Sequence, residues 1–338
     1  MTAPPRLDPA AVRRTLREAG LRPRHGLSQN FLADVDVLEA ILAEAAPAPG
    51  RRVLEIGPGL GILTGGLLAA GAAVTAVELD RGLAIRLRAQ FADAVALGSD
   101  RDPGDPPAGS LRLIEGDALD QDLTALLARP YDVVANLPYH ITSPILHALL
   151  GGASPPERAV LMVQREVAER IAAPPGAMSY LSVFVQYRAR VRIAFRVAPE
   201  AFEPAPAVES AVIVLVPRVP DEEVLPAADE DELWRLVQAA FRERRKMVRN
   251  VLVRQLSVGA DRVDAALAAA GIAPDRRPQT LSVADWLALR KALGAVSPDR
   301  RGRSTRRRTQ VPTREPGADG GQGSAGDAGS AGERGAGP

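Results

Sequence analysis

The stretch Val53–Thr64, "VLEIGPGLGILT", joins a short apolar run to an apolar helical pattern through a loop that contains three glycines. An apolar run of this length is typical of a buried strand. Gly57, Gly59 and Gly61 let the backbone turn sharply and approach a ligand closely. We therefore predict a strand–loop–helix unit with a ligand site at the loop.

Short apolar runs and helical patterns alternate from this unit to about residue 173. The predicted strands are residues 51–57, 72–80, 110–119, 131–139 and 158–164, and the predicted helices are residues 62–71, 81–92, 123–128, 143–150 and 165–173. The fourth of these helices is expected to have Ser143 as its N-cap and Pro144 at its first position. Such alternation indicates a parallel sheet with helices on both faces, a Rossmann-like α/β fold.

The pattern changes beyond residue 180. Residues 181–197 and 210–217 are apolar runs with no clear helix between them, which predicts an antiparallel pair of strands at one edge of the sheet. An apolar stripe that runs from Trp234 through Phe241 to Leu252 then predicts a helix, and two further helical patterns follow it. The sequence therefore predicts a small helical region after the sheet.

These patterns divide the chain into a Rossmann-like domain over residues 1–219, whose first 50 residues precede the glycine loop, and a helical domain over residues 220–296. Residues 297–338 are rich in Arg, Gly, Ala and Ser with almost no apolar residues, so this tail is expected to be disordered. Residues 98–109 are dense in Pro, Gly and Asp and are predicted to be a surface loop without function.

The composition bounds the classes of function. The 338 residues include no cysteine and three histidines, which excludes disulfides and thiolate metal sites, and no metal is expected. No secretory signal and no apolar run of membrane-spanning length is found, so a soluble cytoplasmic protein is expected. The net charge is +1, but acidic residues cluster at 221–232 and basic residues at 241–254 and 299–308, which indicates segments with different roles.

Carboxylates end two of the predicted strands. Glu78 ends the second strand, 21 residues after Gly57, and Asp117 follows the third. Because the carboxyl ends of parallel strands meet at one edge of a sheet, these side chains are expected beside the glycine loop, where a carboxylate can bind both hydroxyls of a ribose. The alternative is that the loop is only a tight turn and the carboxylates only polar strand ends.

Glu55, two positions before the first glycine of the loop, helps to identify the ligand. A dinucleotide fingerprint has the spacing G-x-G-x-x-G and binds a pyrophosphate, whereas this loop reads G-P-G-L-G and follows Glu55. An acidic residue at this position suits a cationic ligand better than a pyrophosphate. S-adenosylmethionine carries a sulfonium and an ammonium and has no phosphate, so it is the expected nucleoside.

The fourth strand ends in "NLPY", residues Asn136 to Tyr139. The Asn136 amide oxygen and the Leu137 carbonyl are two acceptors that could hold the exocyclic amine of a base, and Pro138 would fix the carbonyl direction by locking its own φ. Tyr139 could stack on the base, which is worth roughly 1–3 kcal/mol. The motif predicts methyl transfer to a base lifted out of its stack. Alone, it could equally be a strand end whose tyrosine belongs to the core.

At this point the sequence resembles the ribosomal RNA adenine N6,N6-dimethyltransferase family, and most of all its bacterial small-subunit branch. The resemblance covers residues 27–289. The segments that carry it are "LSQNFL", "LEIGPGLGILT", "VELD", "GDAL", "NLPYHITSPIL", "MVQREVAERI", "FEPAPAVESAVI", "FRERRKMVRNVL" and "LSVADWLAL". It implies a class I S-adenosylmethionine-dependent methyltransferase sheet with a small helical domain, acting on two adjacent adenines near the 3′ end of 16S rRNA.

The resemblance also implies roles for single residues. Asn30 and Leu32 would close over the methyl donor, and Gly57, with Gly59 in the same loop, would lie against its methionine part. Glu78 would bind the ribose, Asp117 the adenine amine, and Asn136 both donor and target. Phe202, in "FEPAPAV", would form the second face of a sandwich around the target adenine, opposite Tyr139.

The basic stretch after Phe241 suggests how RNA is held. Arg242, Arg245 and Arg249 have helical i, i+3, i+7 spacing, and Lys246 adjoins them. A basic stripe on a helix neutralises phosphates and makes binding salt-dependent. The alternative is a solvated helix face that binds nothing.

The expected function is therefore S-adenosylmethionine-dependent dimethylation of adenine N6 in 16S rRNA of the immature small ribosomal subunit, by a monomer. Two alternatives stay open: a 23S rRNA dimethylase that confers antibiotic resistance, and an assembly factor without catalysis. The latter is favoured only by Ser28, which stands where the family usually has glycine. A nicotinamide dehydrogenase is a more distant alternative, because no catalytic proton donor lies near the loop.

Overall fold

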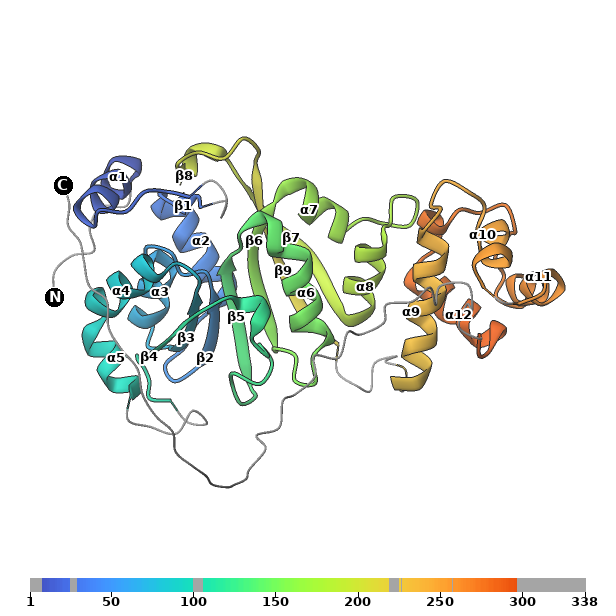
Figure 1. Ribbon diagram of the computed structural model, residues 1–338, viewed down its shortest axis with the longest axis horizontal. Coiled ribbons are helices and arrows are strands. Elements are labelled where there is room, and N and C mark those ends of the chain that lie inside the picture. The colour runs from blue at the N-terminus through green and yellow to red at the C-terminus, as the bar shows by residue number, and fades with distance from the viewer. Residues whose placement is uncertain are drawn as a thin grey trace, which may run out of the picture. The chain divides into compact units, whose positions relative to one another are not determined.

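The computed structural model describes residues 8–24, 29–99, 106–218, 225, 227–256 and 258–296. Its centre is a seven-stranded sheet with the order β4-β3-β2-β5-β6-β9-β7 (Figure 1). The strands are β2 (Arg52–Ile56), β3 (Ala73–Glu78), β4 (Leu111–Glu115), β5 (Tyr131–Asn136), β6 (Arg158–Gln164), β7 (Ala189–Val197) and β9 (Ser210–Pro217). A separate two-stranded sheet pairs β1 (Phe31–Leu32) with β8 (Phe202–Glu203).

The strands from β2 to β6 run parallel, as the alternation predicts. The strand β9 is antiparallel to β6, and β7 is antiparallel to β9. The expected antiparallel pair at one edge is therefore confirmed. The later strand, β9, is inserted next to β6, so β7 forms the edge of the sheet.

Helices cover both faces of the sheet (Figure 1). The helices of the sheet domain are α1 (Pro9–Glu18), α2 (Val35–Ala45), α3 (Ile62–Ala69), α4 (Arg81–Gln90), α5 (Ala92–Ser99), α6 (Thr142–Gly151), α7 (Arg165–Ile171) and α8 (Tyr180–Arg188). Alternate residues of a strand point to opposite faces, so Leu54 packs in the core under α6, and Val53 packs in the core under α2 and α3. Burial on both faces explains why these strands are continuous apolar runs.

Three local predictions within the sheet region are wrong. Residues 180–188 form the helix α8, where a strand was expected; Ser179 and Ser182 make a reciprocal capping box at its start. Residues 123–128 form turns where a helix was predicted. The helix α6 begins at Thr142 after a short 3-10 turn, so Ser143 is not its N-cap.

The helical region contains α9 (Ala227–Phe241), α10 (Val248–Gln255), α11 (Ala260–Ala269) and α12 (Val283–Leu293). These helices pack around the buried Trp286, and Val183 and Tyr187 of α8 belong to the same core. The confirmed features are the helical content and the Rossmann-like sheet; the domain division at residues 219 and 220 stays a prediction.

The single helix expected from Trp234 to Leu252 is wrong, because the chain breaks between α9 and α10. The Val248 N–H donates to the Arg276 carbonyl at 2.7 Å, which starts α10 in a new direction. Of the predicted loop at 98–109, the first two residues end α5 and residues 100–105 lie outside the described residues. The predicted disordered tail, 297–338, also lies outside them. None of the helices within the described ranges combines the length and the apolar character that crossing a bilayer requires.

Candidate active site

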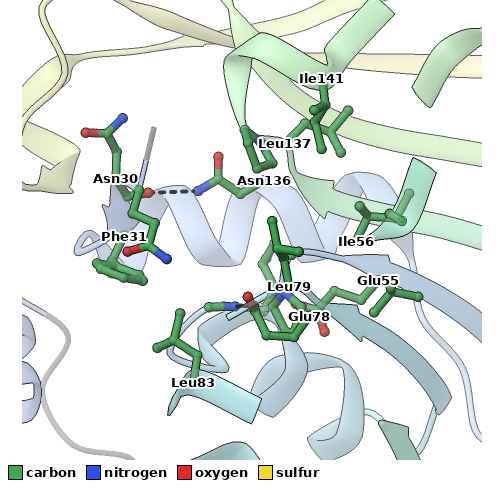
Figure 2. A pocket seen from close by; sticks show the side chains of 18 of the residues that line it. Asn30, Phe31, Glu55, Ile56, Glu78, Leu79, Leu83, Asn136, Leu137 and Ile141 are labelled. Atoms are coloured by element: carbon green, nitrogen blue, oxygen red, sulfur yellow. Dashed lines mark hydrogen bonds between the residues drawn. The ribbon is translucent and has the colours of Figure 1, made fainter. Parts of the chain in front are cut away.

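A cavity lies at the carboxyl ends of β2, β3, β4 and β5, where the glycine loop and the predicted carboxylates meet. Figure 2 shows Asn136 and Leu137 on one side of it, and Glu78 and Leu79 on the other. The predicted site residues that line it are Asn30, Leu32, Gly57, Gly59, Glu78, Asp117, Asn136, Leu137, Pro138 and Tyr139. The fold thus brings together segments that lie more than 100 residues apart in the sequence.

The glycine loop has a backbone that other residues would strain. Gly57 has φ 68° and Gly59 has φ 59°, in the left-handed region that favours glycine. A Cβ on Gly59 would also lie 3.2 Å from the Phe31 ring, which lines the same cavity. Glycine at position 59 therefore provides both the turn and the close approach between the loop and Phe31.

Glu78 organises the loop from the end of β3. Its Oε2 accepts a hydrogen bond from the Gly59 N–H at 3.0 Å, and its Oε1 accepts one from the Asp80 N–H at 2.8 Å. The residue is 5% exposed, and this burial raises the pKa of its carboxyl above the ordinary value, against the two backbone hydrogen bonds. A carboxylate has about four acceptor sites, so lone pairs are left for a ligand.

Glu55 is buried beneath the loop and also reaches the cavity. Its Oε2 accepts a hydrogen bond from the Thr64 hydroxyl on α3 at 2.7 Å. Burial raises the pKa of this carboxyl to about 8, and the nearby Glu78 carboxylate adds to the effect. The group is therefore largely neutral at pH 7, and a cationic ligand beside it would favour its ionised form.

Asp117 follows β4 on the same rim of the sheet. Its Oδ1 accepts a hydrogen bond from the Leu119 N–H at 2.8 Å and caps the short 3-10 helix Ala118–Asp120. This bond fixes the carboxylate at the cavity wall.

The corner formed by "NLPY" is held from two sides. The Asn136 Nδ2 donates a hydrogen bond to the Asn30 backbone carbonyl at 3.2 Å (Figure 2). Leu137 donates its N–H to the Met162 carbonyl of β6 at 3.1 Å. Pro138 has φ −55°, and its carbonyl accepts from the Ile141 N–H at 3.2 Å. With Nδ2 committed to Asn30, the Asn136 side chain has its Oδ1 as an acceptor.

Tyr139 is half-buried at the cavity and its hydroxyl lies 2.7 Å from the Ser210 hydroxyl of β9. Burial raises the pKa of the Tyr139 phenol, and the hydrogen bond to Ser210 opposes this shift. The phenol is therefore neutral at physiological pH.

Phe202 does not line the cavity. It pairs with Leu32 in the small sheet of β1 and β8, is 2% exposed, and packs in the core on the α2 side of the sheet. Its predicted role as a stacking face stays a prediction, and it requires the ring to reach the cavity from this position.

The predicted RNA-contacting residues lie on two elements. Arg242, Arg245 and Lys246 are exposed in the turn between α9 and α10, so the predicted helical stripe is not formed there. Arg249 is on α10, where its guanidinium makes a two-pronged ion pair with Asp264 at 2.6 and 2.7 Å. Arg242 also has a protein partner, because its guanidinium donates a hydrogen bond to the Gln255 side-chain oxygen at 2.9 Å. The ion pair with a carboxylate distinguishes Arg249 from the three cations of the turn.

Several features of the site escape sequence reasoning. Val12 and Leu16 of α1 pack against Phe31 and Leu60, so the N-terminal helix backs the cavity wall. Thr64 is the partner of Glu55, and Ser210 is the partner of Tyr139. Only Ser210 left a signal, as the single polar residue before a run of buried apolar ones. Ser28, the family departure, lies outside the described residues.

No group of three or more histidine, aspartate or glutamate side chains that could hold a metal ion occurs among the residues that the structure describes. The polar groups around the cavity are carboxylates, the amides of Gln29, Asn30 and Asn136, the Tyr139 phenol, the His140 imidazole and backbone groups. Such groups can hold a nucleoside through hydrogen bonds and can orient an amine.

Comparison with known proteins gives the family. The family model for ribosomal RNA adenine dimethylase matches residues 20–294. The protein called ribosomal RNA small subunit methyltransferase A of Anaeromyxobacter dehalogenans (strain 2CP-C) is 43% identical over 287 residues, which are 81% of this chain and 94% of that protein. The protein of the same name from Geobacter sulfurreducens is 41% identical over 288 residues, covering 83% of this chain and 99% of that protein.

Two solved structures have the same fold. The 23S rRNA methyltransferase ErmE superposes with a TM-score of 0.59 at 28% identity, covering 78% of this chain and 99% of that one. A dimethyladenosine transferase from Plasmodium falciparum superposes with a TM-score of 0.62 at 24% identity, covering 77% and 95%. The family match covers the glycine loop, the strand-end carboxylates and the corner at Asn136 in one continuous alignment, and this chain therefore belongs to the ribosomal RNA adenine dimethylase family.

Proposed function

We propose that this protein transfers methyl groups from S-adenosylmethionine to N6 of two adjacent adenosines near the 3′ end of 16S rRNA, in the immature small ribosomal subunit. The observation that carries the proposal is the meeting of two groups in one cavity: Asn136, whose amide is oriented by Asn30, and Glu78, whose carboxylate ends β3. The relatives named as small-subunit enzymes support the choice of RNA.

The donor half of the cavity suits a nucleoside with a cationic side chain. Glu78 has lone pairs for the ribose hydroxyls, and Asp117 is placed on the same rim for the adenine amine. Gly57 and Gly59 leave no side chain between the loop and the ligand. Asn30 and Leu32 form the wall that would close over it.

The target half suits an exocyclic amine. The Asn136 Oδ1 and the Leu137 carbonyl accept hydrogen bonds from the two N–H groups of the amine. These bonds favour a more tetrahedral nitrogen, whose lone pair is less conjugated with the ring. Tyr139 stacks on the base and offsets the few kcal/mol that lifting it from its stack costs. Phe202 would supply the second face only if its ring moved from its buried position in the core to the cavity.

When bound, S-adenosylmethionine supplies an electrophilic methyl group, and as the N6–carbon bond forms the carbon–sulfur bond breaks. The N6 proton then leaves to solvent, so no strong general base is required of the protein. Positioning is the main contribution of these residues.

The exposed cations after α9 provide the RNA surface. Arg242, Arg245 and Lys246 lie exposed in the turn, where they can contact phosphates, and Arg249 contributes less because it is paired with Asp264. We propose that the protein works in the cytoplasm as a monomer.

The test is a methyl-transfer assay with labelled donor on purified immature small subunits, with large-subunit RNA as a parallel substrate. We expect label in 16S rRNA, with N6,N6-dimethyladenosine at adjacent positions by mass spectrometry. Label confined to 23S rRNA would support the resistance-enzyme alternative. Binding to small subunits without any transfer would support a non-catalytic assembly factor.

A further inference from the structure

Ser210 places a hydroxyl where an apolar side chain would be expected. It is the first residue of β9, is 0% exposed, and is followed by the buried residues 211–215. A buried hydroxyl without a hydrogen bond is costly, so such a residue needs a partner. The partner is the Tyr139 hydroxyl, 2.7 Å away and 71 positions earlier in the sequence.

The backbone of Ser210 is held by strands on both sides. It lies opposite Gln164 of β6 on one side and Val197 of β7 on the other. The carbonyl of the preceding residue, Glu209, accepts a hydrogen bond from the Arg165 N–H at 2.9 Å. A side chain bonded to Ser210 is therefore tied to the end of a strand that is paired on both sides.

The Tyr139 side chain is not held by packing alone. Its ring stands outside the strand, in the 3-10 turn Tyr139–Ile141, and one side of it borders the cavity. Tyr131 offers a contrast, because it is 0% exposed and packing holds its ring on every side. A half-buried ring lacks this constraint, so the hydrogen bond at the phenol fixes the position of the end of the ring.

The same bond joins the turn that carries Tyr139 to the start of β9. Ser210 ends the connector that follows Phe202 and Glu203, so the segment carrying Phe202 and the turn carrying Tyr139 meet at one hydroxyl pair. Loss of the Ser210 hydroxyl would therefore remove the hydrogen-bond partner of Tyr139.

We propose that Ser210 is a positioning residue for methyl transfer, which acts through the Tyr139 hydroxyl to hold in place the ring on which the target base stacks. This inference rests on the proposed function. Ser210 touches neither the donor nor the base, and its effect is on the orientation of the target and not on the affinity for the donor.

The test is a double-mutant cycle on the full chain, with Ser210→Ala, Tyr139→Phe and the double variant. The measurements are kcat and KM on immature small subunits and the Kd for S-adenosylmethionine. We expect each single variant to lower kcat on the order of tenfold, the factor that about 1.4 kcal/mol of lost transition-state stabilisation gives. The double variant should be no slower than the singles, and the donor Kd should be unchanged in all three. Ser210→Thr keeps the hydroxyl and should restore most of the rate.

Ser182→Ala is the matched control. Ser182 is also 0% exposed and its hydroxyl donates to the Arg170 carbonyl, but it is on α8 and does not line the cavity. Loss of a buried hydroxyl there should lower the melting temperature and leave kcat unchanged. If Ser210→Ala does not fold, Tyr139→Phe removes the same hydrogen bond without altering β9.

The inference is overturned if Ser210→Ala keeps the wild-type kcat, or if the losses of the two single variants multiply in the double variant. Either result leaves the proposed function intact, because the wild-type protein still methylates the RNA. If the wild-type protein transfers no methyl group to the RNA, the proposed function is wrong, and this inference is wrong with it.

Discussion

The side-chain amide of Asn136 donates a hydrogen bond to the backbone carbonyl of Asn30, 3.2 Å away and 106 positions earlier in the sequence. The bond joins the end of the central strand β5 to the segment that forms one wall of the cavity. It also settles which atom of the amide is available, since Nδ2 is engaged and Oδ1 is left to accept from a ligand. Asn136 is thus held in place by another residue of the cavity wall.

Replacement of Asn136 tests that acceptor. We expect Asn136→Ala to lower kcat by about 10²–10³, the scale on which removal of one preorganised catalytic hydrogen bond usually acts. The Kd for S-adenosylmethionine should change little, because Glu78 and the glycine loop stay in place. Kinetics on small subunits and calorimetry with the donor separate the two effects. Equal losses of rate and donor affinity would contradict the role given to Oδ1.

Replacement of Glu78 tests the donor half. Glu78→Gln puts an amide N–H₂ against one of the two backbone N–H groups that the carboxylate now accepts from, those of Gly59 and Asp80. We expect the Kd for S-adenosylmethionine to rise roughly tenfold or more, since a hydrogen bond to a charged group is worth about 1.5–3 kcal/mol. Calorimetry measures this directly. An unchanged Kd would show that the ribose is held elsewhere.

Glu55 predicts a pH dependence of stability. Its pKa is about 8 in the folded protein against an ordinary value of 4.5, so between these values the folded chain keeps a proton that the unfolded chain has lost. The free energy of unfolding should therefore fall as the pH rises from about 4.5 to about 8, by at most about 1.4 kcal/mol per pH unit, and this contribution is constant outside that window.

The variant Glu55→Gln isolates this effect, because its carbonyl can still accept from Thr64 while it has no proton to lose. Denaturant unfolding at pH 6 and pH 9 should show a smaller decline for the variant than for the wild-type protein. Parallel declines would mean that Glu55 is ionised in the folded state already at pH 6.

The turn between α9 and α10 predicts the salt dependence of RNA binding. The double variant Arg245→Ala, Lys246→Ala should reduce the slope of log K against log salt by about 1.5, since each phosphate contact contributes about 0.7–0.9. Arg235→Ala is the control, because Arg235 is exposed on α9 but is paired with Glu232. Binding to small subunits over a range of salt gives the slopes. Equal slopes for the wild-type protein and the double variant would exclude the turn as a phosphate contact.

Phe202 can be tested with two variants that separate packing from stacking. Phe202→Ala empties a buried site and should lower the free energy of unfolding by about 3–5 kcal/mol. Phe202→Leu keeps most of the volume, so its effect on the melting temperature should be smaller. If the ring stacks on the base, the leucine variant should still lose kcat/KM for RNA. Full activity of a stable Phe202→Leu protein would assign the residue to the core alone.

Much of the fold and most of the site residues were predictable because their signals are local. The alternation of strands and helices, the left-handed glycines and the polar strand ends each depend on a few neighbouring residues. The geometry of a parallel sheet then brings the strand ends together without further information. This is why Glu78, Asp117 and Asn136 could be expected at one cavity, which all three line.

The sequence by itself therefore determined the layers of the fold and the edge of the sheet at which the cavity lies. The tertiary structure decided the outcome where a local sequence pattern is compatible with more than one secondary structure. Residues 180–188 are apolar on nearly every side, and burial against both the sheet and the C-terminal helices makes them a helix. After the break that follows Phe241, the first N–H of α10, that of Val248, is bonded to the distant Arg276 carbonyl. The contact of Tyr139 with Ser210 exists only because β9 is inserted beside β6. Such contacts join residues far apart in the chain, and no local pattern of side chains records which distant backbone will lie beside them.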